Sequence, residues 1–191
     1  GNSGGCRPKC LYHDEDGQWL VKFRHTYDPM DMGVQEYHCN QLARRCGIEV
    51  PDFKLLSDTY FASKRFDISL DGRPLHMATA AALLNENIYP PKTDYKVLLA
   101  LTGYITQSPA EVEQMFRRMV FNVLIGNKDD HAKNFSFVHR DDGWHLAPAY
   151  DLTRCVQGYN GEHATSVMGH GNPSEADMIA AAESIRILPT R

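Results

Sequence analysis

Acids, amides, amines and an imidazole crowd into residues 127–134 of this chain. Asp129 and Asn134 are five positions apart, and Asp151 follows after an expected hairpin. In phosphoryl transfer one carboxylate orients the attacking hydroxyl and accepts its proton, while an amide and a second carboxylate hold Mg²⁺ on the nucleotide phosphates. Hard oxygen ligands of this kind suit Mg²⁺. The spacing equals that of the protein-kinase catalytic loop and its following metal-binding aspartate, so this cluster indicates phosphoryl-transfer chemistry.

Two other interpretations fit the same cluster less well. A polar stretch is often a solvated loop, but here strongly apolar segments flank it on both sides. Asp130 and His131 could instead belong to the histidine–aspartate metal site of a phosphohydrolase. That site needs further histidines on neighbouring helices. The downstream histidines fall in an expected hairpin and loops, which disfavours this reading: His139, His145, His163 and His170.

A phosphoryl-transfer site also needs cations and close backbone near the phosphates, and candidates lie upstream in the required order. Lys22 is expected on a strand, and Glu36 follows 14 residues later on an expected helix, where it could pair with that lysine. Gly4 and Gly5 precede the lysine strand and could let the backbone approach phosphate closely. The joint order of these parts carries more weight than any one of them.

The first third of the chain is expected to be mostly sheet with one helix. Alternation and turn residues predict strands at 9–14 and 18–24, joined at Asp16-Gly17, and a second strand pair at 53–57 and 60–66. A helix is expected over 31–46, ending before Gly47. Its apolar side is expected at the following positions: Val34, Tyr37, Leu42 and Cys46.

The rest of the chain is expected to be mainly helical, with helices at 74–88 and 95–103. The clearest helix begins at the capping box Ser108-Pro109-Ala110-Glu111 and ends at Gly126. Its apolar residues recur at spacings of three and four, which is typical of a well-buried helix. A hairpin over 135–139 and 144–147 and a last helix from Ser174 to about Pro189 follow.

Length and composition set the frame for these elements. The 191 residues are 42% hydrophobic and 23% charged, which is ordinary for a globular protein. The net charge of −4 gives no global electrostatic reason to bind nucleic acid directly or to coat a membrane surface. We find no membrane-spanning stretch and no signal peptide. Five cysteines in irregular spacing argue against a disulfide framework, so we expect a cytoplasmic protein.

The motifs together resemble the HipA family of bacterial serine/threonine kinases, the toxins of certain toxin–antitoxin pairs. The most specific match is Asp129-x-His131-x-Lys133-Asn134-Phe135 followed by Pro148-x-Tyr150-Asp151. Weaker matches extend from Gly4-Gly5 through Leu20-Val21-Lys22-Phe23 and Lys64-Arg65-Phe66-Asp67. The resemblance covers the chain to about residue 152.

This resemblance implies a fold and a set of roles. The fold would be α+β and protein-kinase-like, with a small β-rich N-lobe (1–67), a mainly helical C-lobe (68–191) and truncation at both ends. Asp129 would be the catalytic base, supported by His131 and Lys133, and Asn134 and Asp151 would hold Mg²⁺. ATP would contact the Gly4-Gly5 loop, Lys9, Lys22 with its partner Glu36, and a hinge from Lys64 to Phe66. Ser3 would be the autophosphorylation site.

The activity implied is ATP- and Mg²⁺-dependent phosphorylation of a serine or threonine hydroxyl on a protein. The resemblance suggests an aminoacyl-tRNA synthetase as a possible substrate and a helix-turn-helix antitoxin as a possible partner. The alternative is a kinase-fold remnant, or pseudokinase, that acts as a protein-binding module. The complete set of acids and amide favours the enzyme, because packing alone requires neither Asp129 nor Asp151.

Overall fold

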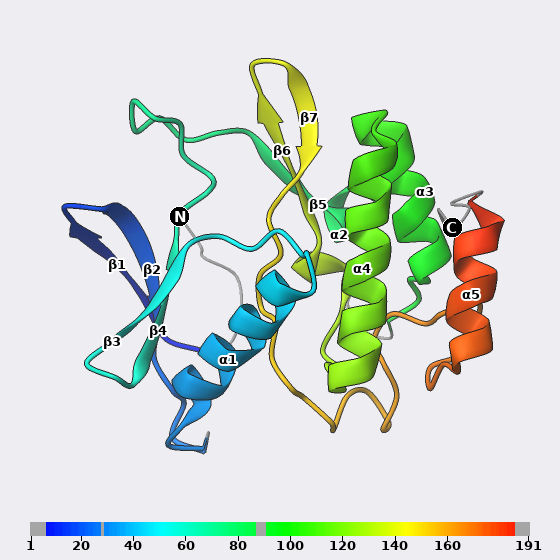
Figure 1. Cartoon of the computed structure of the whole chain (residues 1–191), viewed down its shortest axis with the longest axis horizontal. Helices are drawn as coiled ribbons and strands as arrows, with labels where there is room; N and C mark the ends of the chain where they lie inside the picture. The colour runs from blue at the N-terminus through cyan, green and yellow to red at the C-terminus, as the bar shows by residue number, and fades with distance from the viewer. Residues whose placement is uncertain (1–6, 28, 87–90, 186–191) are drawn as a thin grey trace.

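The computed structural model of the chain describes residues 7–27, 29–86 and 91–185 (Figure 1). A small antiparallel sheet and one long helix form one lobe, and three long helices with a second small sheet form the other (Figure 1). This confirms the α+β, two-lobed fold expected from the sequence. In its described part, no helix combines the length and apolar character that crossing a membrane would require.

The smaller lobe contains a four-stranded sheet in the order β1-β2-β4-β3. Its strands are β1 (Lys9–Asp14), β2 (Gly17–Lys22), β3 (Phe53–Leu56) and β4 (Tyr60–Lys64). The two edge strands meet over one face, because the Lys54 ammonium of β3 lies 2.5 Å from an Asp14 carboxylate oxygen of β1. Trp19 is buried beneath this ion pair, and its ring centroid is 4.0 Å from the Lys54 Nζ. The sheet is therefore curled, with Trp19, Val21 and Ala62 as its core.

Helix α1 (Met32–Arg45) packs against β3 and β4, but with a different face from the one expected. Its buried residues are Glu36, Asn40 and Ala43, whereas Leu42 is exposed. The expected apolar side was therefore wrong. The buried face is polar because Glu36 is paired with Lys22 of β2, and Asn40 donates to the Glu36 carbonyl at 2.9 Å.

The larger lobe contains α3 (Tyr95–Thr106), α4 (Pro109–Ile125) and α5 (Glu175–Ser184), which pack on one another at one side of the molecule (Figure 1). Ser108 caps α4 by accepting from the Glu111 amide, and Gly126 ends it with a left-handed φ of 68°. Both ends were predicted from the sequence. The Glu111 carboxylate accepts from the backbone amide of Leu146 rather than reaching back to the cap, so it fixes α4 to β7 (Gly143–Leu146).

The expected helix over 74–88 is largely wrong. Met77–Thr79 is the strand β5, which pairs with β6 (Ser136–Arg140) in a three-stranded sheet of order β5-β6-β7. Among the described residues of this stretch, only the short α2 (Ala80–Leu83) is helical, and the Thr79 hydroxyl caps it. The Ala/Leu-rich composition favours helix locally, but pairing with β6 overrides that preference.

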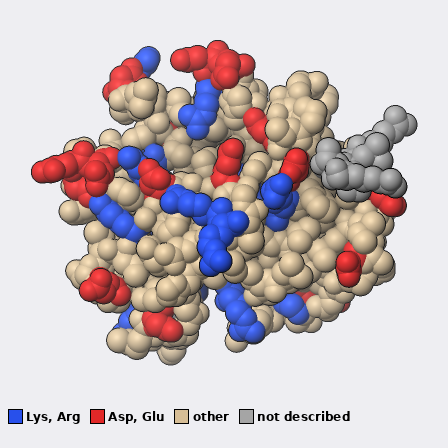
Figure 2. Space-filling view, viewed as in Figure 1, with Lys and Arg blue, Asp and Glu red and all other residues tan. Residues whose placement is uncertain are grey.

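The lobes are joined where α1 ends against α4. Ala43 and Ile48 pack with Phe121 of α4 and with Ala149 and Leu152. The Gln114 amide nitrogen of α4 donates to Gly47 O at 2.8 Å. Figure 2 shows basic side chains near the middle of this face, over the region where α1 meets α4, and the last turn of α1 carries Arg44 and Arg45. This contact fixes the position of α1 relative to the segment that carries Asp151.

Candidate active site

Three charged groups from distant parts of the chain meet between the lobes. The Lys22 ammonium, at the end of β2, lies 2.5 Å from a Glu36 carboxylate oxygen on α1. It also donates to the Asp151 carboxylate, which belongs to the segment after β7. The Glu36 side chain is 5% exposed and that of Lys22 13%. One lysine thus connects the sheet, the helix of the smaller lobe and the larger lobe.

The electrostatics of this group follow from burial and from the shared ammonium. Burial acts against the charge of Lys22, but the carboxylates of Asp151 and Glu36 more than compensate, so its pKa is raised above the ordinary lysine value. Burial would raise the pKa of Asp151, yet the Lys22 ammonium holds it below the ordinary aspartate value. For Glu36, burial outweighs the same ammonium and the pKa is raised. Lys22 and Asp151 therefore form the firmly ionised pair.

The backbone at Asp151 is unusual and helps to aim its side chain. Its φ of 53° lies in the left-handed region, which non-glycine residues seldom adopt, although asparagine and aspartate do so more often than most. The Asp151 carbonyl accepts from the amide nitrogen of Asn127 at 3.4 Å. Asn127 begins the polar stretch predicted to be catalytic, so the two segments are held together through backbone and side chain.

In the polar stretch, the Asp129 side chain is exposed, and the Asn134 side chain folds back onto the Asp129 backbone. The Asn134 amide nitrogen donates to the Asp129 carbonyl at 2.9 Å, which closes the loop and leaves the amide oxygen available to a ligand. The Asp129 carboxylate is 61% exposed, and the His131 Nε2 lies 3.7 Å from it. Partial burial raises the pKa of Asp129, an effect that His131 opposes and Asp151 reinforces.

A pocket lies directly behind these groups. The residues that line it include both candidate magnesium ligands, Asn134 and Asp151, with Asn127, Tyr150 and Arg118 beside them. A carboxylate and an amide oxygen form the hard donor set that Mg²⁺ takes, usually with waters completing its coordination. The donor chemistry of the pocket therefore fits the metal expected from the sequence.

The remaining predicted site residues are placed unevenly. Burial lowers the pKa of Lys9, and Asp151 and Lys22 both act on it electrostatically, so Lys9 lies near the group. Phe66 stacks on Tyr150 with ring centroids 5.9 Å apart. The Lys64 ammonium is instead 4.0 Å from Asp52, on the face of the sheet that carries Trp19.

Other predicted residues contribute less to this arrangement. The Lys133 side chain is exposed, and its carbonyl accepts from the Tyr150 hydroxyl at 2.7 Å. Gly4, Gly5 and Ser3 lie outside the described residues. The backbone amides of Lys64 and Arg65 donate to Asp52 O and Gln18 O within the sheet.

Two buried charged residues near the site were not predicted. Arg118 on α4 is 2% exposed and donates to Ala147 O at 2.7 Å, and burial lowers its pKa to about 10. Its Nε has no hydrogen-bond partner in the described structure, and neither does Asn127 Oδ1. Asp130, 1% exposed, also lines the pocket, and its carboxylate accepts from the Tyr95 hydroxyl at 2.8 Å. The sequence gives little indication that these two are buried, because one is an arginine within an apolar helical repeat and the other an acid within a polar stretch.

Known proteins resemble this chain in sequence and in the arrangement of its elements. A family described as the HipA-like C-terminal domain matches residues 1–190. A putative kinase of Sinorhizobium fredii, Y4dM, is 29% identical over 171 residues, which cover 79% of this chain and 41% of the relative. A putative kinase of Haemophilus influenzae is 24% identical, over 73% of this chain and 46% of the relative. The chain thus spans less than half the length of these relatives.

Solved structures agree at the level of the fold. HipA from Shewanella oneidensis, in a complex with HipB and operator DNA, superposes with a TM-score of 0.76 at 18% identity, covering 96% of this chain and 52% of that one. The Helicobacter pylori proinflammatory kinase CtkA gives a TM-score of 0.61 at 21% identity, over 81% of this chain and 57% of that one. The family match and the shared fold confirm the resemblance read from the motifs, and the chain belongs to the HipA-like C-terminal domain family.

Proposed function

We propose that this chain carries the catalytic unit of an ATP- and Mg²⁺-dependent kinase that phosphorylates a serine or threonine hydroxyl of a protein. The observation that carries the proposal is the meeting of Lys22 with Glu36 and Asp151 between the lobes, beside the loop of Asp129 and Asn134. Packing does not require three charges from three distant segments to converge in this way. Phosphoryl transfer requires such a set for positioning and charge stabilisation.

Asp129 is proposed as the residue that acts on the substrate hydroxyl. Its carboxylate is exposed and near enough to Asp151 to feel its charge, and its carbonyl is fixed by Asn134. A raised pKa makes this carboxylate a better proton acceptor than an ordinary aspartate, provided that it stays ionised at the working pH. His131, 3.7 Å away, opposes that rise and is proposed to keep Asp129 ionised.

Lys22 is proposed to hold phosphate oxygens, with Glu36 keeping its ammonium in place. The Glu36 carboxylate comes from a helix packed on the sheet, and it holds the lysine where its ammonium also reaches Asp151. Lys9 adds a second positive charge near Asp151. Phe66, stacked on Tyr150, and the adjoining strand end are proposed to border the adenine.

Mg²⁺, when bound, would neutralise charge on the phosphates and orient them. Asn134 and Asp151 are the residues proposed to hold it, because both line the same pocket with oxygen donors. The Asn134 amide nitrogen is already committed to the Asp129 carbonyl, so its oxygen faces the ligand. Lys22 shares the Asp151 carboxylate and keeps it ionised for this purpose.

The macromolecular partners are proposals from the family. The Shewanella relative was solved with HipB and operator DNA, so we propose a helix-turn-helix antitoxin of that kind as a partner of this protein. An aminoacyl-tRNA synthetase is the first protein substrate to assay. The remnant or pseudokinase alternative predicts protein binding without metal-dependent nucleotide binding.

Calorimetry of ATP binding with and without Mg²⁺ tests the proposal. We expect Mg²⁺-dependent binding that Asp151→Asn weakens at least about tenfold, since a metal-ligand carboxylate is lost. Asp71→Asn, which alters an exposed loop acid paired with Arg73, is the matched control and should bind like the unaltered protein. ATP binding that depends neither on Mg²⁺ nor on Asp151 would support the kinase-fold remnant instead.

A further inference from the structure

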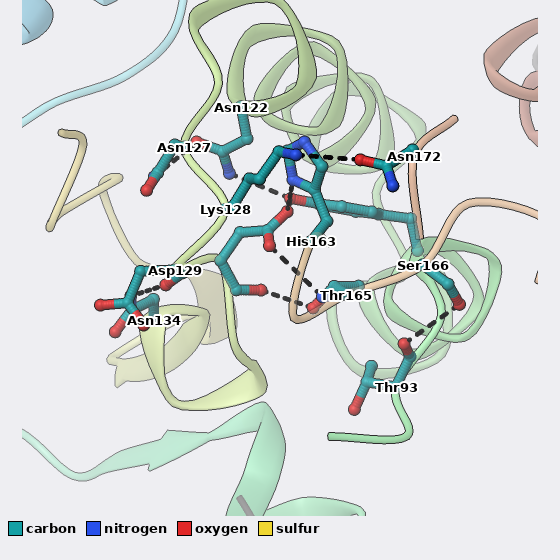
Figure 3. A network of polar contacts seen from close by, with 12 residues as sticks. Thr93, Asn122, Asn127, Lys128, Asp129, Asn134, His163, Thr165, Ser166 and Asn172 are labelled. Carbon is teal, nitrogen blue, oxygen red and sulfur yellow. Dashed lines mark hydrogen bonds and ion pairs between the residues drawn. The ribbon is translucent and has the colours of Figure 1, made fainter. Parts of the chain in front are cut away.

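Asp130 is the acid of the catalytic loop that the proposed mechanism leaves unused. Its side chain is fully buried, whereas that of the adjacent Asp129 is 61% exposed. A buried carboxylate is costly unless it is hydrogen-bonded, so its partners define what it does. Figure 3 shows these partners around the loop, with His163 and Thr165 from a segment more than thirty residues later in the chain.

The Asp130 carboxylate gathers donors from two separate elements. Tyr95, at the start of α3, donates its hydroxyl at 2.8 Å. His163 Nδ1 lies 3.0 Å from the same oxygen, and the Thr165 amide donates to the other oxygen at 3.3 Å. The Thr165 hydroxyl also donates to the Asp130 carbonyl at 2.5 Å. Burial raises the pKa of Tyr95 well above its ordinary value, so the phenol keeps its proton and remains a donor.

The same network continues toward Asp151. The Tyr95 hydroxyl accepts from Asn122 of α4 at 3.0 Å, and Asn122 accepts from Asn127 at 3.0 Å. Asn127 in turn contacts the Asp151 carbonyl. One hydrogen-bonded chain therefore runs from the segment 163–166 through the catalytic loop to the backbone of a proposed metal ligand.

The segment 163–166 is itself held on both sides. Its Ala164 amide donates to Lys128 O at 3.1 Å, on the catalytic-loop side. On the opposite side, Ser166 donates its hydroxyl to Asp94 at 2.7 Å, ahead of α3. The loop and the segment therefore lie side by side, joined by the Ala164–Lys128 backbone bond and by the bonds of His163 and Thr165 to Asp130.

We propose that Asp130 is a positioning residue that holds the catalytic loop against the segment 163–166, so that the Asp129 carboxylate keeps one orientation in the proposed active site. With the Asp130 side chain and carbonyl held on one side and the Asp129 carbonyl held by Asn134 on the other, the peptide between them has a single orientation. Small misplacements of a reacting group cost large factors in rate. This inference rests on the proposed function for its consequence on rate, but the link itself is independent of activity.

Matched variants separate hydrogen bonding from packing. Tyr95→Phe keeps the ring, which packs edge-on against Phe135, and removes only the hydroxyl. His163→Asn keeps a donor near the Nδ1 position but loses ring volume, whereas His163→Leu keeps more volume and loses the donor. Ser166→Ala removes a hydroxyl from the same segment that bonds to Asp94 and Thr93 O, and it serves as the control.

The readout is the split between kcat and nucleotide affinity, measured on the full chain below the melting temperature of each variant. Tyr95→Phe and His163→Leu should lower kcat about tenfold or more, while the Kd for ATP with Mg²⁺ stays unchanged. His163→Asn should recover kcat to within about threefold of the unaltered protein. An unaltered kcat in Tyr95→Phe, or a loss in His163→Asn as deep as in His163→Leu, would overturn the proposal.

Amide hydrogen exchange tests the link without any activity. In Tyr95→Phe, residues 127–134 and 163–166 should exchange faster together, whereas Ser166→Ala should affect only the later segment. If the unaltered protein transfers no phosphate, the proposed kinase function fails while the exchange result still decides the link. Exchange that accelerates in neither stretch, or in one alone, would show that Asp130 does not couple them.

Discussion

Replacing Lys22 by methionine gives the sharpest test of how the lobes are joined. The change keeps the buried stem and removes the ammonium that Glu36 and Asp151 share. It leaves two carboxylates near each other, one of them only 5% exposed, without a cation between them. Removing one partner of a buried ion pair costs about 3–5 kcal/mol. Because Asp151 is 34% exposed, we expect the lower end, about 3 kcal/mol near neutral pH.

The loss should depend on pH in a defined direction. Burial raises the pKa of Glu36 and Lys22 is the main group that opposes this rise, so the pKa rises further in Lys22→Met. A carboxyl with a higher pKa in the folded than in the unfolded chain binds its proton more tightly when folded. The free energy of unfolding therefore falls as pH rises from the unfolded pKa of Glu36 to its folded pKa. It recovers as pH is lowered, by up to about 1.4 kcal/mol per pH unit.

Urea unfolding followed by fluorescence or circular dichroism, near neutral pH and in mild acid, measures both effects. The double variant Lys22→Met with Glu36→Gln removes the unpaired buried charge and should regain most of the lost stability. Arg73→Met is the control, because its pair with Asp71 is exposed and local, and contributes little to stability. A Lys22→Met protein as stable as the unaltered one, or a double variant no better than the single, would refute the reasoning.

Three further outcomes follow from the site and its supports. Because the pKa of Asp129 is raised, kcat should fall with decreasing pH above the range of an ordinary aspartate, and a pH–rate profile that stays flat into that range would contradict it. Asp129→Asn should still bind ATP with Mg²⁺ in calorimetry, since Asp129 is proposed to contact the substrate hydroxyl. Gly33→Ala should lower stability by about 1–3 kcal/mol in urea unfolding, because a Cβ would overlap Thr59 O and push α1 off the sheet. Gly103→Ala, whose Cβ would meet only the movable Val112 side chain at 3.3 Å, should cost little.

The parts of the fold that the sequence predicted well have strong local signals. The cap at Ser108, the stop at Gly126 and the strands around Lys22 each follow from residues close in sequence. Ser174 likewise forms a complete capping box with Asp177 at the start of α5. That helix ends at Ser184, with its C-cap at Ile185, which is earlier than the expected end near Pro189.

The errors have a common physical origin in contacts between distant residues. The stretch at 77–79 is a strand only because β6 pairs with it, and no local pattern records that partner. The buried face of α1 is determined by Glu36, whose partner Lys22 lies on β2, rather than by the apolar residues of the helix. A buried polar group cannot be told from a solvated one until its partners are known.

The same limit applies to the site. The Lys22–Glu36 pair was predicted, and the structure brings it together with Asp151. The burial of Arg118 and Asp130 near the site was not predicted, because an arginine within an apolar helical repeat and an acid within a polar run are usually exposed. The placement of Lys64 toward Asp52 and Trp19 also depends on how the sheet curls.

The most direct test of the proposed active site is transfer of labelled γ-phosphate from ATP by the unaltered protein and by Asp129→Asn, each with Mg²⁺. The site described here predicts transfer to a serine or threonine hydroxyl by the unaltered protein. In the variant, transfer should fall by about a hundredfold or more, while ATP binding persists. Equal transfer by the two proteins would contradict the assignment of Asp129, and metal-dependent ATP binding without transfer by the unaltered protein would contradict the kinase function itself.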